Sequence, residues 1–159
     1  MEKNELLKQF EEEFAKVKKD LGFKASLEEL DGVFFLRDFI LKEGFVPTTL
    51  SRSICGRMME TYFSWTNYLH SLLMPNPGYM ISMSESQMFN DHEKEEVFKI
   101  ISKVMVLINR NSIIGLTKNK ADEGKFIDDC LFFWNKTFKL EIEKIVKKIK
   151  DSWEEKSKP

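Results

Sequence analysis

The sequence predicts an all-α fold, in the form of a single antiparallel bundle of four to five helices. Apolar residues recur at steps of three and four along most of the chain, and the two-residue alternation typical of strands is almost absent. The helical segments are long and their connections short, as in up-and-down bundles. At 159 residues the chain fits one domain. We therefore predict a single domain over 1–159, with a frayed end at 154–159.

The first two helices are delimited by their capping residues. An amphipathic helix is expected from about Asn4 until Gly22, whose freedom to adopt a left-handed conformation ends helices. Ser26 begins the second helix, and Glu29 three residues later completes a capping box. The apolar pattern continues without interruption to about Glu43, so one helix is predicted over 26–43.

The third helix, over about 49–74, is predicted to be central because it has two apolar stripes and only a narrow polar seam. Pro75 ends it. The seam includes Arg57, Glu60, Asn67 and His70. In one interpretation Arg57 and Glu60 pair on a solvent-facing surface. In the other a neighbouring helix covers the seam, and a buried polar network would then mark a functional site.

Two more helices follow a long connection over 75–90. Asn90 or Asp91 caps the fourth, whose first turn is acidic, as the helix dipole favours. Its pattern fades between Arg110 and Gly115. The last helix begins near Ala121 and continues to Lys150 or beyond, with the most regular apolar stripe in the chain.

Composition argues against several classes of function. The 25 basic and 26 acidic residues leave a net charge of −1, so no overall field attracts nucleic acid or an anionic membrane. The charged start predicts no signal peptide, and polar residues and prolines interrupt the longest uncharged stretch, 61–84, which argues against a membrane span. Cys55 and Cys130 lie among apolar neighbours in helices, which indicates buried, reduced thiols. We expect a cytoplasmic protein.

Motifs for metal or cofactor chemistry are weak. A carboxylate-bridged di-iron bundle needs two Glu-x-x-His pairs, yet Asn67 and Phe89 stand three residues before His70 and His92. His92 and Glu96 have the four-residue spacing of metal ligands, although a solvent-exposed first turn explains them equally well. We expect no metal, no cofactor and no catalytic residue.

A magnesium site in a helical hydrolase would need carboxylates from two helices. The residues considered for it are Glu93, Glu95, Glu96, Asp128 and Asp129. In an antiparallel arrangement the start of the fourth helix lies far from the start of the fifth, which argues against this site. Glycine-rich phosphate loops and nucleophile motifs are also missing from the sequence.

The connection after the third helix is unusually apolar for a loop. Tyr79, Ile81 and Met83 alternate with smaller or polar residues, which predicts an extended segment with one apolar face. Methionine-rich surfaces adapt well to partners. The predicted partner-binding residues are Tyr79, Met80, Ile81, Met83, Met88 and Phe89. Alternatively, the segment folds back as a lid over the open end of the bundle.

Lysines recur on one face of the last helix. They are candidates for phosphate contacts: Lys136, Lys139, Lys147 and Lys150. A solvated helix face has the same pattern, with Glu143 and Lys147 as a favourable pair. The function we predict is a non-enzymatic protein–protein interaction or scaffold protein, with self-association as one form of that interaction. RNA or nucleotide binding through the lysine face is the alternative.

Overall fold

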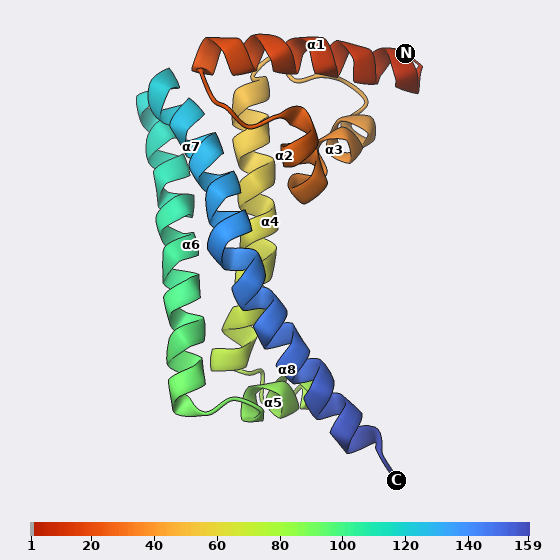
Figure 1. The fold of residues 1–159 in the computed structure, drawn as a ribbon, viewed down its shortest axis with the longest axis vertical. Coiled ribbons are helices and arrows are strands. Elements are labelled where there is room, and N and C mark those ends of the chain that lie inside the picture. The colour runs from red at the N-terminus through yellow and green to blue at the C-terminus, as the bar shows by residue number, and fades with distance from the viewer. Residues whose placement is uncertain (1) are drawn as a thin grey trace. The chain divides into compact units, whose positions relative to one another are not determined.

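The computed structural model describes residues 2–159 and confirms the all-α prediction, because every regular element of those residues is a helix (Figure 1). The helices are α1 (Lys3–Leu21), α2 (Leu27–Phe34), α3 (Leu36–Glu43), α4 (Leu50–Leu73), α5 (Met80–Gln87), α6 (Asp91–Thr117), α7 (Lys120–Phe133), the π-helix η1 (Trp134–Phe138) and α8 (Lys139–Ser157). Among the described helices, none is both long enough and apolar enough to cross a membrane.

The chain divides into two compact units. The first unit contains the residues up to Thr61 together with Leu107–Phe132, and the second contains Tyr62–Val106 and Phe133–Pro159. All three divisions along the chain fall inside helices, within α4, within α6 and before the last residue of α7. Each of these helices therefore contributes residues to both units.

Caps set the boundaries of α1 and α2 as predicted. Gly22 has a φ of 72°, and its N–H donates to the carbonyl of Lys18. The Ser26 hydroxyl accepts from the Glu29 N–H at 3.1 Å, while the Glu29 carboxylate accepts from the Ser26 N–H at 2.8 Å. Both halves of the predicted capping box are therefore formed.

The prediction of one helix over 26–43 is wrong, since the segment contains α2 and α3 with a reversal between them. Phe35 takes a left-handed conformation, with a φ of 55°. The Asp31 carboxylate accepts the backbone N–H of Arg37 at 2.8 Å, an amide that a continuous helix would give to the carbonyl four residues earlier. A side-chain cap thus replaces the helical hydrogen bond at this point.

Polar contacts between distant segments join the elements of the first unit. The Asp128 carboxylate on α7 accepts the backbone N–H groups of Lys24 and Ala25 at 2.8–3.0 Å. Close by in the chain, Gly124 lies against the carbonyl oxygen of Leu21, where an added Cβ would come within 2.2 Å. Glycine at 124 therefore allows α7 to approach the end of α1 closely.

Aromatic rings form the centre of the second unit. The Tyr62 ring lies 5.1 Å from that of Phe138, 5.7 Å from that of Trp134 and 5.9 Å from that of Phe133, measured between centroids. Tyr62 and Phe138 are fully buried. Stacked and edge-on rings at these separations stabilise a core beyond the effect of apolar burial.

The segment over 75–90 contains the helix α5, so the prediction of an extended conformation is wrong for Ile81 and Met83, whereas Tyr79, directly before the helix, is extended. The Ser86 hydroxyl donates to the carbonyl of Leu72 at 2.7 Å, which ties α5 to the end of α4. The helix is stabilised by this tertiary contact, which an alternating local pattern could not predict.

The helix α6 begins as predicted. Asn90 and Glu93 exchange side-chain and backbone hydrogen bonds of 2.9 and 3.1 Å, which forms a second capping box. The predicted fading between Arg110 and Gly115 is wrong, because α6 continues to Thr117.

The last predicted helix contains three successive helical elements, α7, η1 and α8. The Lys139 N–H donates to the carbonyl of Trp134, five residues earlier, which defines the π-turn. Residues 154–157 are helical, and the fraying of 154–159 stays a prediction.

Candidate functional site

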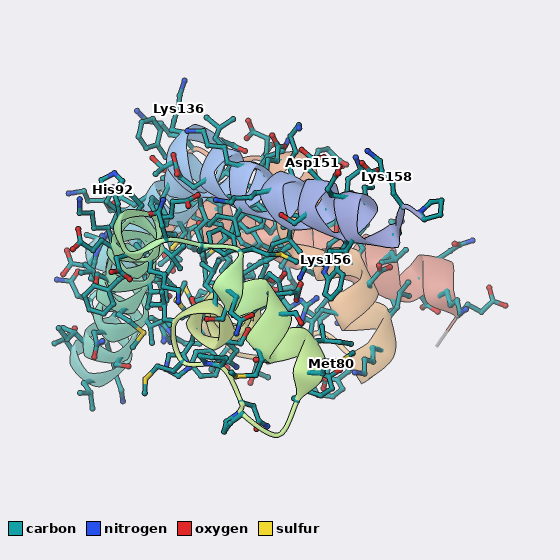
Figure 2. All side chains as sticks on the ribbon, turned by 90° about the horizontal axis from the view of Figure 1, so that it is seen from below. Met80, His92, Lys136, Asp151, Lys156 and Lys158 are labelled. Atoms are coloured by element: carbon teal, nitrogen blue, oxygen red, sulfur yellow. The ribbon has the colours of Figure 1, made fainter. Side chains whose placement is uncertain are left out.

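A group of large apolar side chains is exposed around the connection between α4 and α5, and we call it the methionine patch. The exposed fractions are 70% for Met74, 55% for Tyr79, 75% for Met80 and 43% for Ile81. Figure 2 shows Met80 at the tip of α5. All four residues fall within eight positions of the second unit. Contiguous exposed apolar surface typically marks an interaction site.

The six predicted partner-binding residues divide into two groups. Tyr79, Met80 and Ile81 are exposed, whereas Met83 and Met88 are half-buried. Phe89 is buried, and the Lys148 ammonium lies 5.1 Å from its ring centroid. The second half of the segment therefore packs inward and anchors the exposed first half. Met74 is not among the six predicted residues; it stands directly before Pro75 and lies outside α4.

The polar seam on α4 is largely solvent-facing. In the first unit, Arg57 donates from Nε to the carbonyl of Phe34 at 2.9 Å and from its guanidinium to the exposed Glu60 at 3.2 Å. In the second unit, Asn67 and His70 are both exposed. The arrangement matches the solvent-facing pair more closely than a buried network.

A buried polar network that sequence reasoning missed lies elsewhere in the first unit. Glu123 is only 6% exposed, and it accepts from the Arg52 guanidinium at 2.8 Å. The same guanidinium donates to the side-chain oxygen of Asn111 at 2.7 Å. Gly115 leaves room for it, since a Cβ there would come within 3.3 Å. The network joins α4, α6 and α7. Since the charges of Arg52 and Glu123 are paired with each other, we assign it a structural role.

The two cysteine thiols, Cys55 and Cys130, are shielded from solvent by burial. Burial raises the pKa of Cys55 to about 12, with the charge of Glu123 adding to the effect, and burial likewise raises the pKa of Cys130. Both cysteines are buried, and neither forms a disulfide. Since the thiolate is the reactive form, neither cysteine is prepared to act as a nucleophile.

The carboxylates proposed for magnesium mostly have partners of their own. Asp129 pairs with Arg110 at 2.9 Å, Glu96 with Lys99 at 2.8 Å, and Glu93 with Lys148. Asp128 caps the segment before α2. His92 is exposed (Figure 2). Within residues 2–159, no three His, Cys, Asp or Glu side chains gather in a way that could hold a metal ion.

A second surface feature of the second unit is an open apolar groove of about 420 Å³, which we call the tryptophan groove. Its apolar walls come from α4, η1 and α8: Trp65, Trp134, Ile142 and Val146. Its charged rim lies along α8: Lys139, Glu143, Lys147 and Lys150. Three of the four lysines predicted as phosphate contacts thus border one cavity, whereas Lys136 projects at the outer edge of Figure 2 and is exposed.

Two of the rim lysines have acidic neighbours on α8. Lys147 lies 2.6 Å from Asp151, and Lys150 lies 3.1 Å from Glu154. All of these side chains are well exposed. Such pairs contribute little to stability and rearrange easily in water.

No protein-family model, curated protein or solved structure matches this chain. Functional inference therefore depends on the two surfaces of the second unit, the methionine patch and the tryptophan groove. The groove is lined by residues of α4, η1 and α8, whereas the methionine patch lies on the connection after α4 and on the start of α5.

Proposed function

We propose that this chain is a non-enzymatic protein–protein interaction module that binds its partner through the methionine patch. The observation that carries the proposal is the exposure of four large apolar side chains within eight residues. Leaving such surface in water is unfavourable, and covering it with a partner gains about 25 cal/mol per Å² of apolar area. Methionine and tyrosine are also enriched in protein interfaces.

The position of α5 supports a stable binding surface. Ser86 and Phe89 hold the inner side of the segment against the unit, and the Trp153 indole lies 3.4 Å from the Glu85 carboxylate. Fixing the backbone before binding reduces the entropy that association costs. Unbranched methionine side chains at the tip can still adapt to the partner's shape.

We also propose that the chain acts as one cytoplasmic domain, a bundle of four to five helices around the helix at 49–74. The passage of α4 and α6 through both compact units supports this proposal. A single domain unfolds in one cooperative step, with the calorimetric enthalpy equal to the van't Hoff enthalpy. Two separate thermal transitions would contradict it.

Sedimentation of the full chain over a range of concentrations tests self-association. We expect an oligomer in the wild type and a monomer in the Met74→Ser plus Met80→Ser variant. The matched control is Ile113→Ser plus Leu116→Ser, which removes two exposed apolar side chains of the first unit. Equal loss in both variants would indicate nonspecific apolar contact and contradict a patch-specific interface.

If the wild type is monomeric, the partner is a different protein. Quantitative capture from an extract of the source cells should then retain a protein that the control variant also retains and the Met74→Ser plus Met80→Ser variant loses. A monomeric wild type that retains no such protein contradicts the proposal.

RNA or nucleotide binding through Lys136, Lys139, Lys147 and Lys150 is the alternative. It has less support, because the chain has a net charge of −1 and Glu143 interrupts the lysine face. Phosphate contacts would make affinity fall steeply with salt concentration. Flat salt dependence, or unchanged binding in a Lys147→Glu plus Lys150→Glu variant, would exclude it.

A further inference from the structure

The tryptophan groove is a preformed cavity whose walls are held by the core of the second unit. The Trp134 ring lies 5.7 Å from that of Tyr62 and 5.3 Å from that of Phe138. Across the groove, the Trp65 ring lies 6.2 Å from that of Tyr68. Its volume of about 420 Å³ falls within the usual range for sites that bind small molecules.

The π-turn explains how the groove acquires a continuous apolar wall. Trp134 precedes Ile142 by eight positions and Val146 by twelve, spacings that would not place all three in one row on an ideal α-helix. The extra residue of a π-turn makes these spacings equivalent to about seven and eleven, which are close to two and three full α-helical turns. Turns of this kind often occur at functional sites.

Charge at the rim selects a type of ligand. Three ammonium groups and one carboxylate, that of Glu143, border the cavity. The pairs that Lys147 and Lys150 make with Asp151 and Glu154 are exposed, so both ammonium groups can turn to a ligand at little cost. An anionic head would therefore find cationic partners beside an apolar floor.

From this combination we propose that the tryptophan groove binds a monomeric amphiphilic carboxylate, an unbranched alkyl chain with one carboxylate head. The alkyl chain of the ligand covers Trp65, Trp134 and the α8 wall, and its carboxylate head accepts hydrogen bonds from the rim lysines. Inorganic phosphate would leave the apolar walls in water, and an uncharged alkyl compound would gain nothing from the lysines. The groove and the methionine patch share no residue, so this proposal is independent of the proposed function.

Isothermal titration calorimetry of the full chain with decanoate, kept below its micellar concentration, tests the proposal. We expect saturable one-to-one binding, accompanied by a change in tryptophan fluorescence. The affinity for 1-decanol should be several-fold lower, and inorganic phosphate alone should not bind. Equal affinity for decanol, or binding only to phosphatidylcholine vesicles that contain an anionic lipid, would overturn the proposal.

Two groove variants, each with a matched control, test whether the ligand binds in the tryptophan groove. Lys147→Gln plus Lys150→Gln should weaken decanoate binding roughly three- to tenfold, the effect of losing two exposed charge contacts. Lys3→Gln plus Lys8→Gln, which removes the same charge from α1, should leave it unchanged. Val146→Glu places a carboxylate in the wall and should abolish binding, whereas Val106→Glu, at an exposed site on α6, should not. Unchanged binding in either groove variant would overturn the proposal.

Discussion

Both units of this chain have a buried apolar core, and they differ in their other contacts and in the apolar surface that they leave exposed. Specific polar contacts between distant segments join the first unit, such as Arg52 with Glu123 and Asp128 with the backbone of Lys24. The second depends on packed rings around Tyr62. The second unit is the shorter, yet it contains ten of the fifteen large apolar side chains exposed among the described residues: Phe63, Met74, Tyr79, Met80, Ile81, Phe98, Met105, Val106, Leu140 and Val146.

That difference identifies where binding is expected. A unit built from large apolar residues has more of them than its own core can cover, and the excess forms the methionine patch and the wall of the tryptophan groove. The first unit adds directional hydrogen bonds to its buried apolar core, and it leaves fewer large apolar side chains exposed for a partner. Mutations in the two units should therefore destabilise the protein for different physical reasons.

The largest loss of stability is expected where α7 lies against the end of α1 in the first unit. In Gly124→Ala the new Cβ would meet the Leu21 carbonyl oxygen at 2.2 Å, and a backbone atom cannot move aside easily. We expect a loss of about 3–5 kcal/mol in the free energy of unfolding, measured by denaturant titration.

Gly56→Ala is the matched control for this variant, because no atom lies within 4 Å of the added Cβ and the site is inside α4. Alanine in a helix interior should stabilise the chain by about 0.5–1 kcal/mol. Similar stabilities for the two variants would mean that the helices of the first unit do not approach this closely.

The second unit should be most sensitive at its ring cluster. Phe138→Ala removes a fully buried ring and leaves a cavity beside Tyr62 and Trp134, so we expect a loss of about 3–4 kcal/mol in the free energy of unfolding. Phe132→Ala, at a side chain that is 64% exposed, should change it by less than about 0.5 kcal/mol. Chemical denaturation of both variants measures the contrast, and equal losses would contradict the assignment of the core.

The next largest loss in the free energy of unfolding is expected at the buried ion pair of the first unit, Arg52 with Glu123. Glu123→Ala leaves the Arg52 guanidinium without its carboxylate in a partly buried site, which should cost about 2–3 kcal/mol. Replacing both partners, as in Arg52→Met plus Glu123→Leu, should recover most of that loss, because no charge then remains unpaired. Thermal and denaturant unfolding of the single and double variants completes the test. A double variant less stable than the single one would show that the pair itself stabilises the unit.

Local signals in the sequence were sufficient where a helix begins or ends at a capping residue. Ser26 with Glu29, Gly22 and Asn90 each act through hydrogen bonds or dihedral angles within a few residues. Phe35 shows the limit of that reasoning. Its left-handed conformation depends on Asp31 taking the amide of Arg37, a choice that no periodicity reveals.

The candidate sites were harder to predict, because they depend on contacts between distant segments. The exposed methionines were expected from the composition of the connection, but their helical conformation depends on Ser86 meeting the carbonyl of Leu72. The groove was not predicted, since the π-turn shifts the register of Trp134 relative to Val146. The lysines on α8 were visible in the sequence, whereas the apolar wall beside them was not.

The smallest effect concerns a polar contact of the second unit. The Glu93 carboxylate accepts from the Lys148 ammonium and from the Asn90 N–H, and these hydrogen bonds hold the pKa of Glu93 below its ordinary value. Unfolding removes both contacts, so the pKa returns to normal in the unfolded chain. The contribution of Glu93 to stability is therefore fully present above the ordinary pKa of glutamate and is lost as pH falls through the lowered pKa of the folded state.

Denaturant titrations of wild type and Glu93→Gln at pH 7 and near pH 3 measure this contribution. At pH 7 the variant should be less stable by no more than about 0.5 kcal/mol, because both side chains are about one-third exposed and water screens the charges. At the lower pH the difference should shrink. A difference that grew as pH fell would mean that folding raises the pKa of Glu93, which the contact with Lys148 does not allow. The small size of this effect beside the loss expected for Phe138→Ala would place the stability of the second unit in its rings.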